Sequence, residues 1–270
     1  MADERGGKGA PRVSPDFYWE KSSAGLVMRC RALDPHATHA FTTRHLEFRG
    51  DMPADYARLA AALSVPGSAV IAVSQVHGRD VLVVRPGDQP FANPTADVVV
   101  TSDPDLVASV RVADCVPILL ADRQGRAVAA VHAGWRGTAA NAAGAAVAAL
   151  ARVGVPAEDL IAAVGPSIGP CCYQVDAEVR TRFVAAGSDV SRWFEADGAR
   201  RWKLNLWQAN SDQLVAAGLE PGNVHVTALC TFDHPSVFYS YRREGVSAGR
   251  MVGAIRAGRA GAVVPVPSNG

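Results

Sequence analysis

Short runs of valine, isoleucine and alanine recur along the chain and are separated by Gly, Pro and Asp. Runs of this kind, bounded by turn-forming residues, are typical of buried β-strands. They predict strands at residues 70–73, 81–84, 98–101, 107–112, 117–120, 128–131, 160–164, 224–229 and 237–241. Most connections between them are too short for a helical crossover. The pattern therefore favours an α+β fold, with layered mixed β-sheets covered by helices, over a doubly wound parallel sheet.

Helices are expected in separate blocks between these strands. Thr138, Asp176 and Asn205 are suitable N-caps for helices over residues 138–152, 176–186 and 205–217. Residues 54–63 predict another helix, and a further one is expected from about residue 249 towards residue 256.

The domain organisation is expected to be simple. The chain has 270 residues, of which 49% are hydrophobic, enough for a substantial core. Residues 16–260 are predicted to form one catalytic domain, because no internal repeat or linker interrupts them. Residues 1–15, which are charged and glycine-rich, predict a disordered tail, and residues 261–270 a C-terminal tail.

Charge and cysteine content favour a cytoplasmic protein. With 27 basic and 26 acidic residues the net charge is +1, which gives no electrostatic reason to expect nucleic acid or an anionic membrane as partner. The start of the chain lacks the apolar core of a signal peptide, and the apolar segment 139–150 is too short to span a membrane. Five cysteines without framework spacing suit a reducing compartment. Four of them are expected as buried or partly buried thiols: Cys30, Cys171, Cys172 and Cys230.

The fifth cysteine belongs to a group of potential metal ligands. His77, Cys115 and His132 each lie where a predicted strand meets a turn, so a rigid scaffold could bring them together. Two imidazoles and a thiolate form a three-ligand zinc set with one open position, as in catalytic sites. Asp114, beside the thiolate, could carry a proton, orient a ligand histidine or merely hold a turn.

A phosphate site is expected next to these ligands. Gly134 and Gly137 flank Arg136 just before the helix predicted at Thr138, an arrangement that attracts anions. Arg136 could bind phosphate bidentately, with Arg44 as a second contact, or it could form a local salt bridge.

Five motifs together resemble the YfiH/laccase-domain family, and the resemblance extends from about residue 38 to residue 256. This family is also called the peptidoglycan editing factor or multicopper polyphenol oxidase-like family, and it is related to the human purine nucleoside enzyme FAMIN. The motifs are residues 75–78 (Gln-Val-His-Gly), 113–115 (Ala-Asp-Cys), 132–137 (His-Ala-Gly-Trp-Arg-Gly), 165–173 (Gly-Pro-Ser-Ile-Gly-Pro-Cys-Cys-Tyr) and 238–243 (Phe-Tyr-Ser-Tyr-Arg-Arg).

The resemblance implies a YfiH-like fold and a zinc ion held by His77, Cys115 and His132. It also implies a purine nucleoside phosphorylase acting on adenosine, inosine and methylthioadenosine, with adenosine deaminase activity as well. In that case Cys115 and His132 are catalytic, Arg44 and Arg136 bind substrate, and the partners are small purine nucleosides and phosphate. The oligomeric state stays open.

One segment departs from the family pattern. Family members usually follow Thr-Arg with a glycine-rich Gly-Gly-Val-Ser stretch, whereas Thr43-Arg44 is followed here by residues 45–51, His-Leu-Glu-Phe-Arg-Gly-Asp. Metal binding should survive this change, while substrate choice could shift.

Three other functions are open on sequence alone. Without a metal, Cys115 and His132 could act as the nucleophile and base of a hydrolase or amidase, although such a pair has no need of His77. Copper-dependent phenol oxidation fits a His-Cys-His set, but copper is less expected than zinc because seven histidines supply few ligands for a multicopper enzyme. A non-enzymatic metal-binding factor in cell-wall quality control is the third alternative.

Overall fold

The fold was determined as a computed structural model that describes residues 10–49, 53–88, 94–187 and 189–258. Residues 1–9 of the expected N-terminal tail and all of 261–270 lie outside this range. Within the described part of the tail, the Pro11 carbonyl accepts a hydrogen bond of 2.8 Å from the Trp19 indole. The chain therefore packs against the domain before residue 16.

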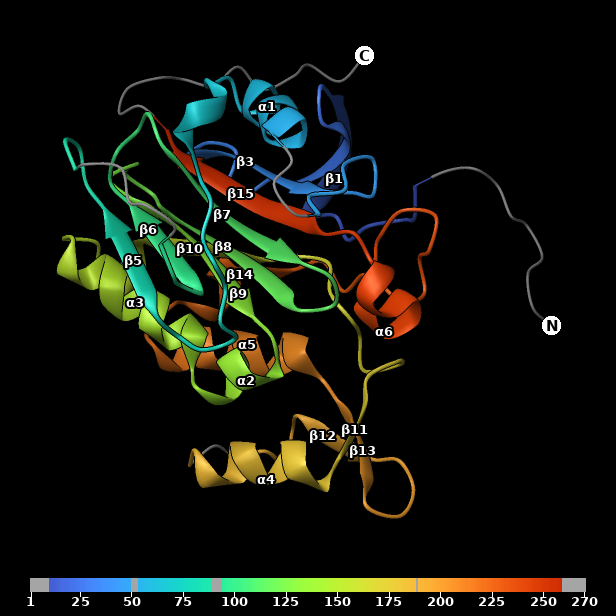
Figure 1. Ribbon diagram of the computed structural model, residues 1–270. Coiled ribbons are helices and arrows are strands. Elements are labelled where there is room, and N and C mark those ends of the chain that lie inside the picture. The colour runs from blue at the N-terminus through green and yellow to red at the C-terminus, as the bar shows by residue number, and fades with distance from the viewer. Residues whose placement is uncertain (1–9, 50–52, 89–93, 188, 259–270) are drawn as a thin grey trace.

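Two six-stranded sheets form the centre of the molecule (Figure 1). The first is antiparallel except for its last pair, β7–β4. Its strands, in spatial order, are β1 (Phe17–Ser22), β2 (Gly25–Cys30), β3 (Ala37–Thr42), β15 (Met251–Ala257), β7 (Val107–Val112) and β4 (Val70–Ile71).

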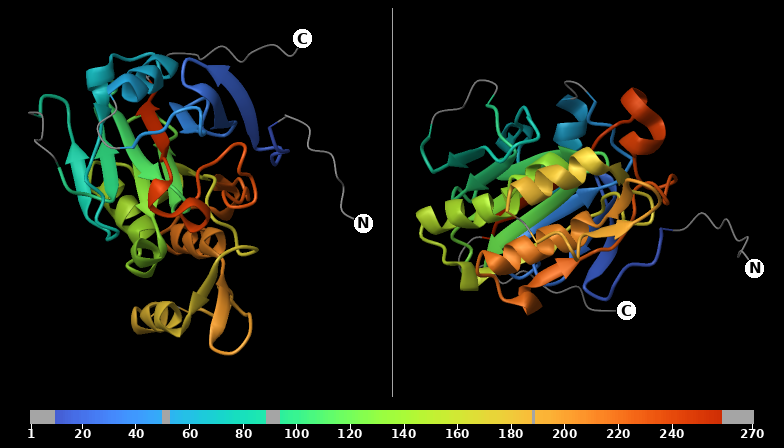
Figure 2. Two further views of the ribbon diagram at one scale, coloured as in Figure 1. Left: turned by 45° about the vertical axis from the view of Figure 1, so that its right-hand side comes forward. Right: turned by 90° about the horizontal axis from the view of Figure 1, so that it is seen from below.

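The second sheet is antiparallel in its middle and parallel at both edges. Its order is β14 (Val224–Val226), β10 (Leu160–Val164), β8 (Val116–Asp122), β9 (Val128–Ala133), β6 (Val98–Thr101) and β5 (Val81–Val84). A small antiparallel sheet lies beside the main body (Figure 2), formed by β11 (Gln174–Asp176), β13 (Arg201–Leu204) and β12 (Phe194–Ala196).

Helices cover the outer faces of the two large sheets. Ten- and eleven-residue helices alternate with short ones: α1 (Pro53–Ala62), α2 (Trp135–Ala139), α3 (Ala142–Arg152), α4 (Ala177–Ala185), α5 (Leu206–Ala216) and α6 (Tyr241–Glu244). Helix α1 lies over the first sheet, while α2, α3 and α5 lie over the second (Figure 1).

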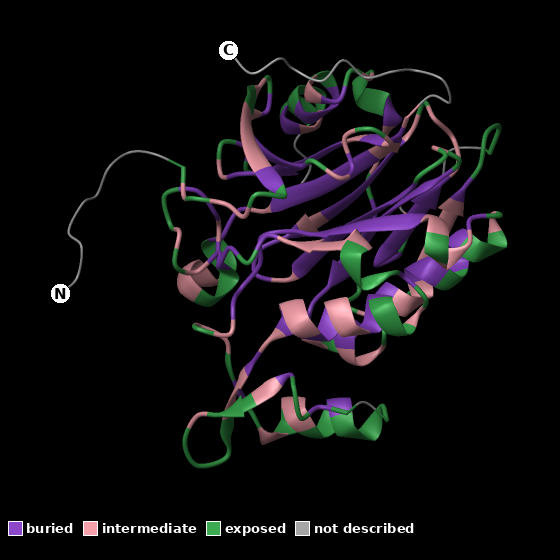
Figure 3. Cartoon of the chain, turned by 180° about the vertical axis from the view of Figure 1, so that it is seen from behind, coloured by how far each residue is buried: buried purple, intermediate pink, exposed green. Residues whose placement is uncertain are grey.

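Strand β8 shows how the sequence specifies these layers. Ile118 and Leu120 face the helices, whereas Leu119 and Ala121 face the first sheet, and all four are fully buried. A strand buried on both faces needs an unbroken apolar run instead of alternation. The buried residues accordingly follow the central strands of both sheets (Figure 3), which confirms the α+β class of layered mixed sheets.

Several local predictions were wrong. The helix expected from residue 249 towards 256 is absent, and residues 251–257 form strand β15, because they pair with β3 and β7 in the middle of the first sheet. Residues 237–240 are not a strand, since Ser240 caps the short helix α6. Thr138 lies within α2 and caps nothing; α3 starts instead after Asn141, whose side chain accepts from the backbone N–H of Gly144. Cys171 is exposed, contrary to expectation.

Other predictions are confirmed or incomplete. Strands β5, β6, β7 and β10 have the predicted bounds, and Asp176 and Asn205 cap α4 and α5. The strands β1 to β3 were not predicted. Among the described residues, no helix has both the length and the apolar character needed to cross a membrane.

Candidate metal centre and its cavity

His77, Cys115 and His132 come together although they belong to different layers. His77 follows β4, Cys115 lies in the turn where the chain passes from β7 in the first sheet to β8 in the second, and His132 is in β9. One ligand atom from each lies within 4.8 Å of the others. The structure thus brings together all three residues predicted as ligands.

The register of β8 and β9 fixes two of these side chains. His132 is paired with Pro117, so Cys115 lies beside Gly134 just beyond the paired residues. A Cβ atom on Gly134 would lie 2.7 Å from the Cys115 Sγ atom. Glycine is therefore required at this position for the thiol to reach the cluster.

Asp97 holds both histidines in place. Its fully buried carboxylate lies 2.8 Å from Nδ1 of His132 and accepts hydrogen bonds from the backbone N–H groups of His77 and Gly78, at 3.0 and 2.6 Å. His77 has a left-handed backbone conformation, with φ of 60°, which these two bonds stabilise. Since an ionised carboxylate can only accept, the His132 proton lies on Nδ1 and Nε2 is free for a metal.

The charges of the cluster are strongly coupled. Burial would raise the pKa of the Cys115 thiol, but His132 and His77 outweigh that effect and lower it to about 6. Burial would lower the pKa of His132, but the Cys115 thiolate and Asp97 outweigh it and raise the value to about 9. Near neutral pH the side chains therefore supply a thiolate, which is the form that binds metals.

These residues fit a bound metal ion. The donors are one soft sulfur and two borderline nitrogens, and Asp97 gives one ring the outer partner that metal-bound histidines usually have. Because the set has three ligands, a fourth position is left for water or substrate. His77, which a Cys–His nucleophile pair does not need, lies 4.8 Å from His132 between ring centroids. The geometry favours the metal interpretation over the metal-free hydrolase.

The cluster lies in the wall of a cavity of about 730 Å³. Among the lining residues are five arginines: Arg49, Arg111, Arg136, Arg242 and Arg250. Within the described ranges, none of these five guanidinium groups forms an ion pair with a carboxylate. A cavity with that excess of unpaired positive charge attracts anions.

Aromatic rings hold three of these arginines. The guanidinium carbon of Arg136 lies 4.2 Å from the Trp135 ring centroid, that of Arg242 lies 5.1 Å from Tyr173, and that of Arg250 lies 5.9 Å from Tyr241. Stacking restricts a guanidinium and leaves the N–H groups that have no other acceptor available for an oxyanion. Arg242 also donates to the Gln174 carbonyl, and Arg250 donates to the carbonyls of Ala248 and Gly249. Among the residues that the structure describes, the local salt bridge expected as the alternative role of Arg136 is not found.

The hydrogen bonds of Asp114 indicate a structural role. Its buried carboxylate accepts hydrogen bonds from the Thr231 hydroxyl at 2.6 Å, the Ser240 hydroxyl at 3.0 Å and the backbone N–H of Arg242 at 2.6 Å. Three donors leave it poorly placed to transfer a proton. It ties the Cys115 turn to residues 231–242, and the ligand histidine is oriented by Asp97 instead.

Arg44 lies apart from the other predicted site residues. It is not among the residues that line the cavity. Its guanidinium stacks on Tyr239 at 4.7 Å, donates to the Pro235 carbonyl and lies 3.9 Å from a Glu244 carboxylate oxygen. These contacts neutralise its charge and occupy its donors.

The segment after Arg44 does reach the cavity. Phe48 and Arg49 line it, and the backbone N–H groups of Glu47 and Phe48 donate to the Asp55 carboxylate in α1 at 2.8 and 3.1 Å. The Phe48 ring is fully buried beneath this wall, so the part of the chain that departs from the family pattern contributes one cation, Arg49, to the pocket. Residues 50 and 51 of that segment lie outside the described part.

Comparison with known proteins agrees with this fold. Residues 41–258 match the family model described as multi-copper polyphenol oxidoreductase laccase. A purine nucleoside phosphorylase of Bacteroides thetaiotaomicron is 35% identical over 161 residues, which are 59% of this chain and 60% of that protein. The purine nucleoside phosphorylase YfiH of Shigella flexneri is 36% identical over 198 residues, 73% of this chain and 77% of that protein.

A solved structure shows the same architecture. The crystal structure of Bacillus licheniformis YfiH superposes with a TM-score of 0.80 at 27% identity, covering 90% of this chain and 98% of that one. The family model and the relatives confirm the resemblance that the five motifs indicated. The chain belongs to the multi-copper polyphenol oxidoreductase laccase family, which here includes proteins named YfiH.

Proposed function

We propose that this chain is a zinc-dependent purine nucleoside phosphorylase acting on adenosine, inosine and methylthioadenosine. The observation that carries the proposal is the juxtaposition of a three-ligand metal cluster with five arginines that lack carboxylate partners in the described structure. Similar proteins that carry the phosphorylase name support it.

The cavity offers a place for each part of the substrates. Phosphorolysis forms a bond from a phosphate oxygen to C1′ of the ribose, while the bond from C1′ to the purine nitrogen breaks and the leaving base takes up a proton. Arg136 and Arg242, which line the same cavity as the cluster, would bind and orient the phosphate. Tyr173 and Tyr241 provide aromatic surface for the purine and the ribose.

The metal and its ligands act beside this phosphate site. Bound Zn²⁺ would supply Lewis-acid polarisation of phosphate or water, serving phosphorolysis and, with adenosine, deamination. Cys115 and His132 contribute by holding that charge at the cavity wall, and Asp97 fixes the ring of His132.

Copper-dependent phenol oxidation, despite the family's description, has less support. A blue-copper centre adds an axial methionine or similar ligand to His₂Cys. In the described part of the chain, the one further cluster of potential ligands contains no histidine. Among the described residues, the further histidine clusters that a multicopper site would need are therefore absent.

Chromatographic assay of the purified full chain tests the proposed function. We expect release of free adenine, hypoxanthine or methylthio-adenine from the corresponding nucleosides only when inorganic phosphate is present. Inosine formed from adenosine without phosphate would reveal deamination as the main activity. Failure to release base from any of the three nucleosides by zinc-loaded protein would refute the assignment.

Replacing Arg136 with alanine should raise the KM for phosphate by at least about tenfold while leaving zinc content unchanged, because one charge-assisted hydrogen-bonding group is lost. Arg152→Ala, at the exposed end of α3, is the matched control and should keep the wild-type KM. An unchanged phosphate KM in Arg136→Ala would place phosphate elsewhere.

A further inference from the structure

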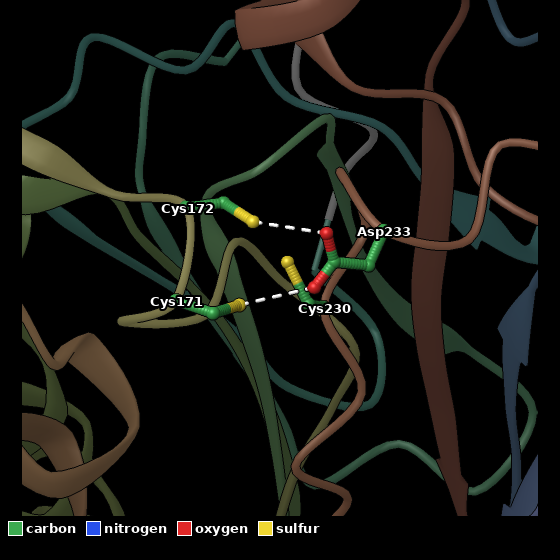
Figure 4. A group of neighbouring side chains, drawn as sticks. All are labelled: Cys171, Cys172, Cys230 and Asp233. Atoms are coloured by element: carbon green, nitrogen blue, oxygen red, sulfur yellow. Dashed lines mark hydrogen bonds between the residues drawn. The ribbon is translucent and has the colours of Figure 1, made fainter. Parts of the chain in front are cut away.

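A second cluster of potential ligands lies outside the cavity. Cys171, Cys172, Cys230 and Asp233 place one ligand atom each within 4.8 Å of one another. The two adjacent thiols point towards the Asp233 carboxylate, and the Cys230 sulfur lies beside it (Figure 4). The Cys171 and Cys172 Sγ atoms lie 3.1 and 3.0 Å from separate oxygens of that carboxylate.

The local backbone explains how adjacent cysteines can face the same way. The backbone N–H of Cys172 donates to the Gly169 carbonyl at 3.0 Å, which closes a tight turn with Pro170 in its second position. Proline fixes the backbone angle that such a turn needs. In an extended strand the two side chains would point to opposite faces, but the turn directs both thiols to one side.

The second half of the cluster is brought in by strand-like pairing. Ser167 and Cys230 form a parallel bridge, and the backbone N–H of Gly169 donates to the Cys230 Sγ atom at 3.3 Å. Asp233 follows three residues later in the same turn. Cys230 is buried, whereas Cys171 and Asp233 are exposed, so an ion could enter from solvent.

The charges that this second cluster can carry favour a cation as its ligand. Four groups that can each carry a negative charge converge here, yet no Lys, Arg or His nitrogen forms an ion pair with Asp233 in the part of the chain that the structure describes. Thiolates are soft ligands that select ions such as Zn²⁺. Three sulfurs and one carboxylate oxygen complete a tetrahedral set with no open position, which is typical of structural sites.

We propose that Cys171, Cys172, Cys230 and Asp233 form a second, structural metal site for a thiophilic divalent cation, with Zn²⁺ as the fitting ion. Ligand separations of up to 4.8 Å require a modest contraction, because sulfurs bound to one zinc at about 2.3 Å lie roughly 3.8 Å apart. The exposed turn that carries Cys171 and Cys172 can supply this movement.

A metal ion bound at this second site would stabilise the wall of the cavity. It joins residues 165–173, which contribute Ile168 and Tyr173 to the lining, to residues 230–242, which contribute Tyr241 and Arg242. Thr231, between the ligands Cys230 and Asp233, donates to Asp114 beside Cys115. An ion at the second site thus fixes the two segments that hold Arg242 in the lining of the same cavity as the first cluster.

The test counts zinc in a chain whose first cluster has been disabled. Purified Cys115→Ser protein, dialysed against buffered zinc, should retain about one equivalent, and X-ray absorption should show sulfur ligands at about 2.3 Å. Cys115→Ser combined with Cys171→Ser should lose that equivalent. Cys115→Ser combined with Cys30→Ala, which removes a thiol outside both clusters, should keep it.

The zinc count does not depend on nucleoside turnover, so this test and that of the proposed function fail separately. Absence of zinc from Cys115→Ser protein would overturn the second site. So would absorption data that show only nitrogen and oxygen ligands, or thiol titration showing that two of the three cysteines form a disulfide. Since Cys171 is exposed, its replacement by serine should not impair folding, which circular dichroism verifies.

Discussion

Replacing Cys115 with serine should lower bound zinc by about one equivalent per chain and reduce phosphorolysis by more than about 100-fold, above the loss typical of an outer partner of a metal ligand. The thiolate is the softest donor of the cluster and its only side chain with a formal negative charge. Serine is similar in size but does not ionise near neutral pH. Elemental analysis and the base-release assay measure the two effects.

The control for this substitution is Cys30→Ala, a buried thiol in β2 that contacts neither cluster. It should retain wild-type zinc and activity. If Cys115→Ser behaves in the same way, Cys115 is not a ligand. If Cys115→Ser loses zinc but keeps its activity, phosphorolysis does not require the metal.

The pH dependence of zinc binding provides an independent check on the same ligand. Below pH 9 His132 must lose a proton to bind zinc, and below about pH 6 Cys115 must lose one as well. Affinity should therefore decline as the pH falls from 9 and decline more steeply below 6. In Cys115→Ser the steeper part should disappear, and the first decline should begin at a lower pH, because the Cys115 thiolate helps to raise the pKa of His132.

Local sequence predicted the strands better than it predicted the residues that surround the metal ligands. Residues 107–112 and 160–164 are short runs rich in valine, alanine, isoleucine or leucine between turn residues, and their strands have the predicted bounds. Residues 251–257 combine Gly, Ala, Met and Ile and are buried on both faces, so no periodicity distinguishes a strand from a helix. Their strand state depends on pairing with β3 and β7, which are distant in sequence.

The same limit applies to the site. The three ligands could be predicted because each ends a strand within a recognisable motif. Asp97 was missed because a single aspartate before a valine run is a common strand boundary, and its contact with His132 spans 35 residues. The one available signal was its position just before β6, which pairs with the strand that carries His132. The unpaired state of the cavity arginines likewise depends on where distant acids lie.

Replacing Asp97 with alanine should weaken zinc binding by about 10- to 100-fold and also destabilise the fold, because Asp97 positions ligands without being one. The His77 and Gly78 N–H groups and the His132 ring would lose a buried acceptor. Each unsatisfied donor costs about 1–3 kcal/mol, so thermal unfolding should occur at a clearly lower temperature. Zinc titration and thermal unfolding measure the two effects.

A matched variant separates positioning from general stability. Asp122 is another fully buried carboxylate, at the far end of β8, where it accepts hydrogen bonds from Arg126 at 2.6 and 2.9 Å. Asp122→Ala should also lower the unfolding temperature, because the partly buried backbone N–H of Arg126 loses its acceptor and the Arg126 guanidinium keeps only Asp159 as a partner. Its zinc affinity should stay at the wild-type value. Equal loss of zinc affinity in both variants would mean that Asp97 acts only through the stability of the fold. Loss of zinc affinity in Asp97→Ala alone would show that its carboxylate orients both histidines.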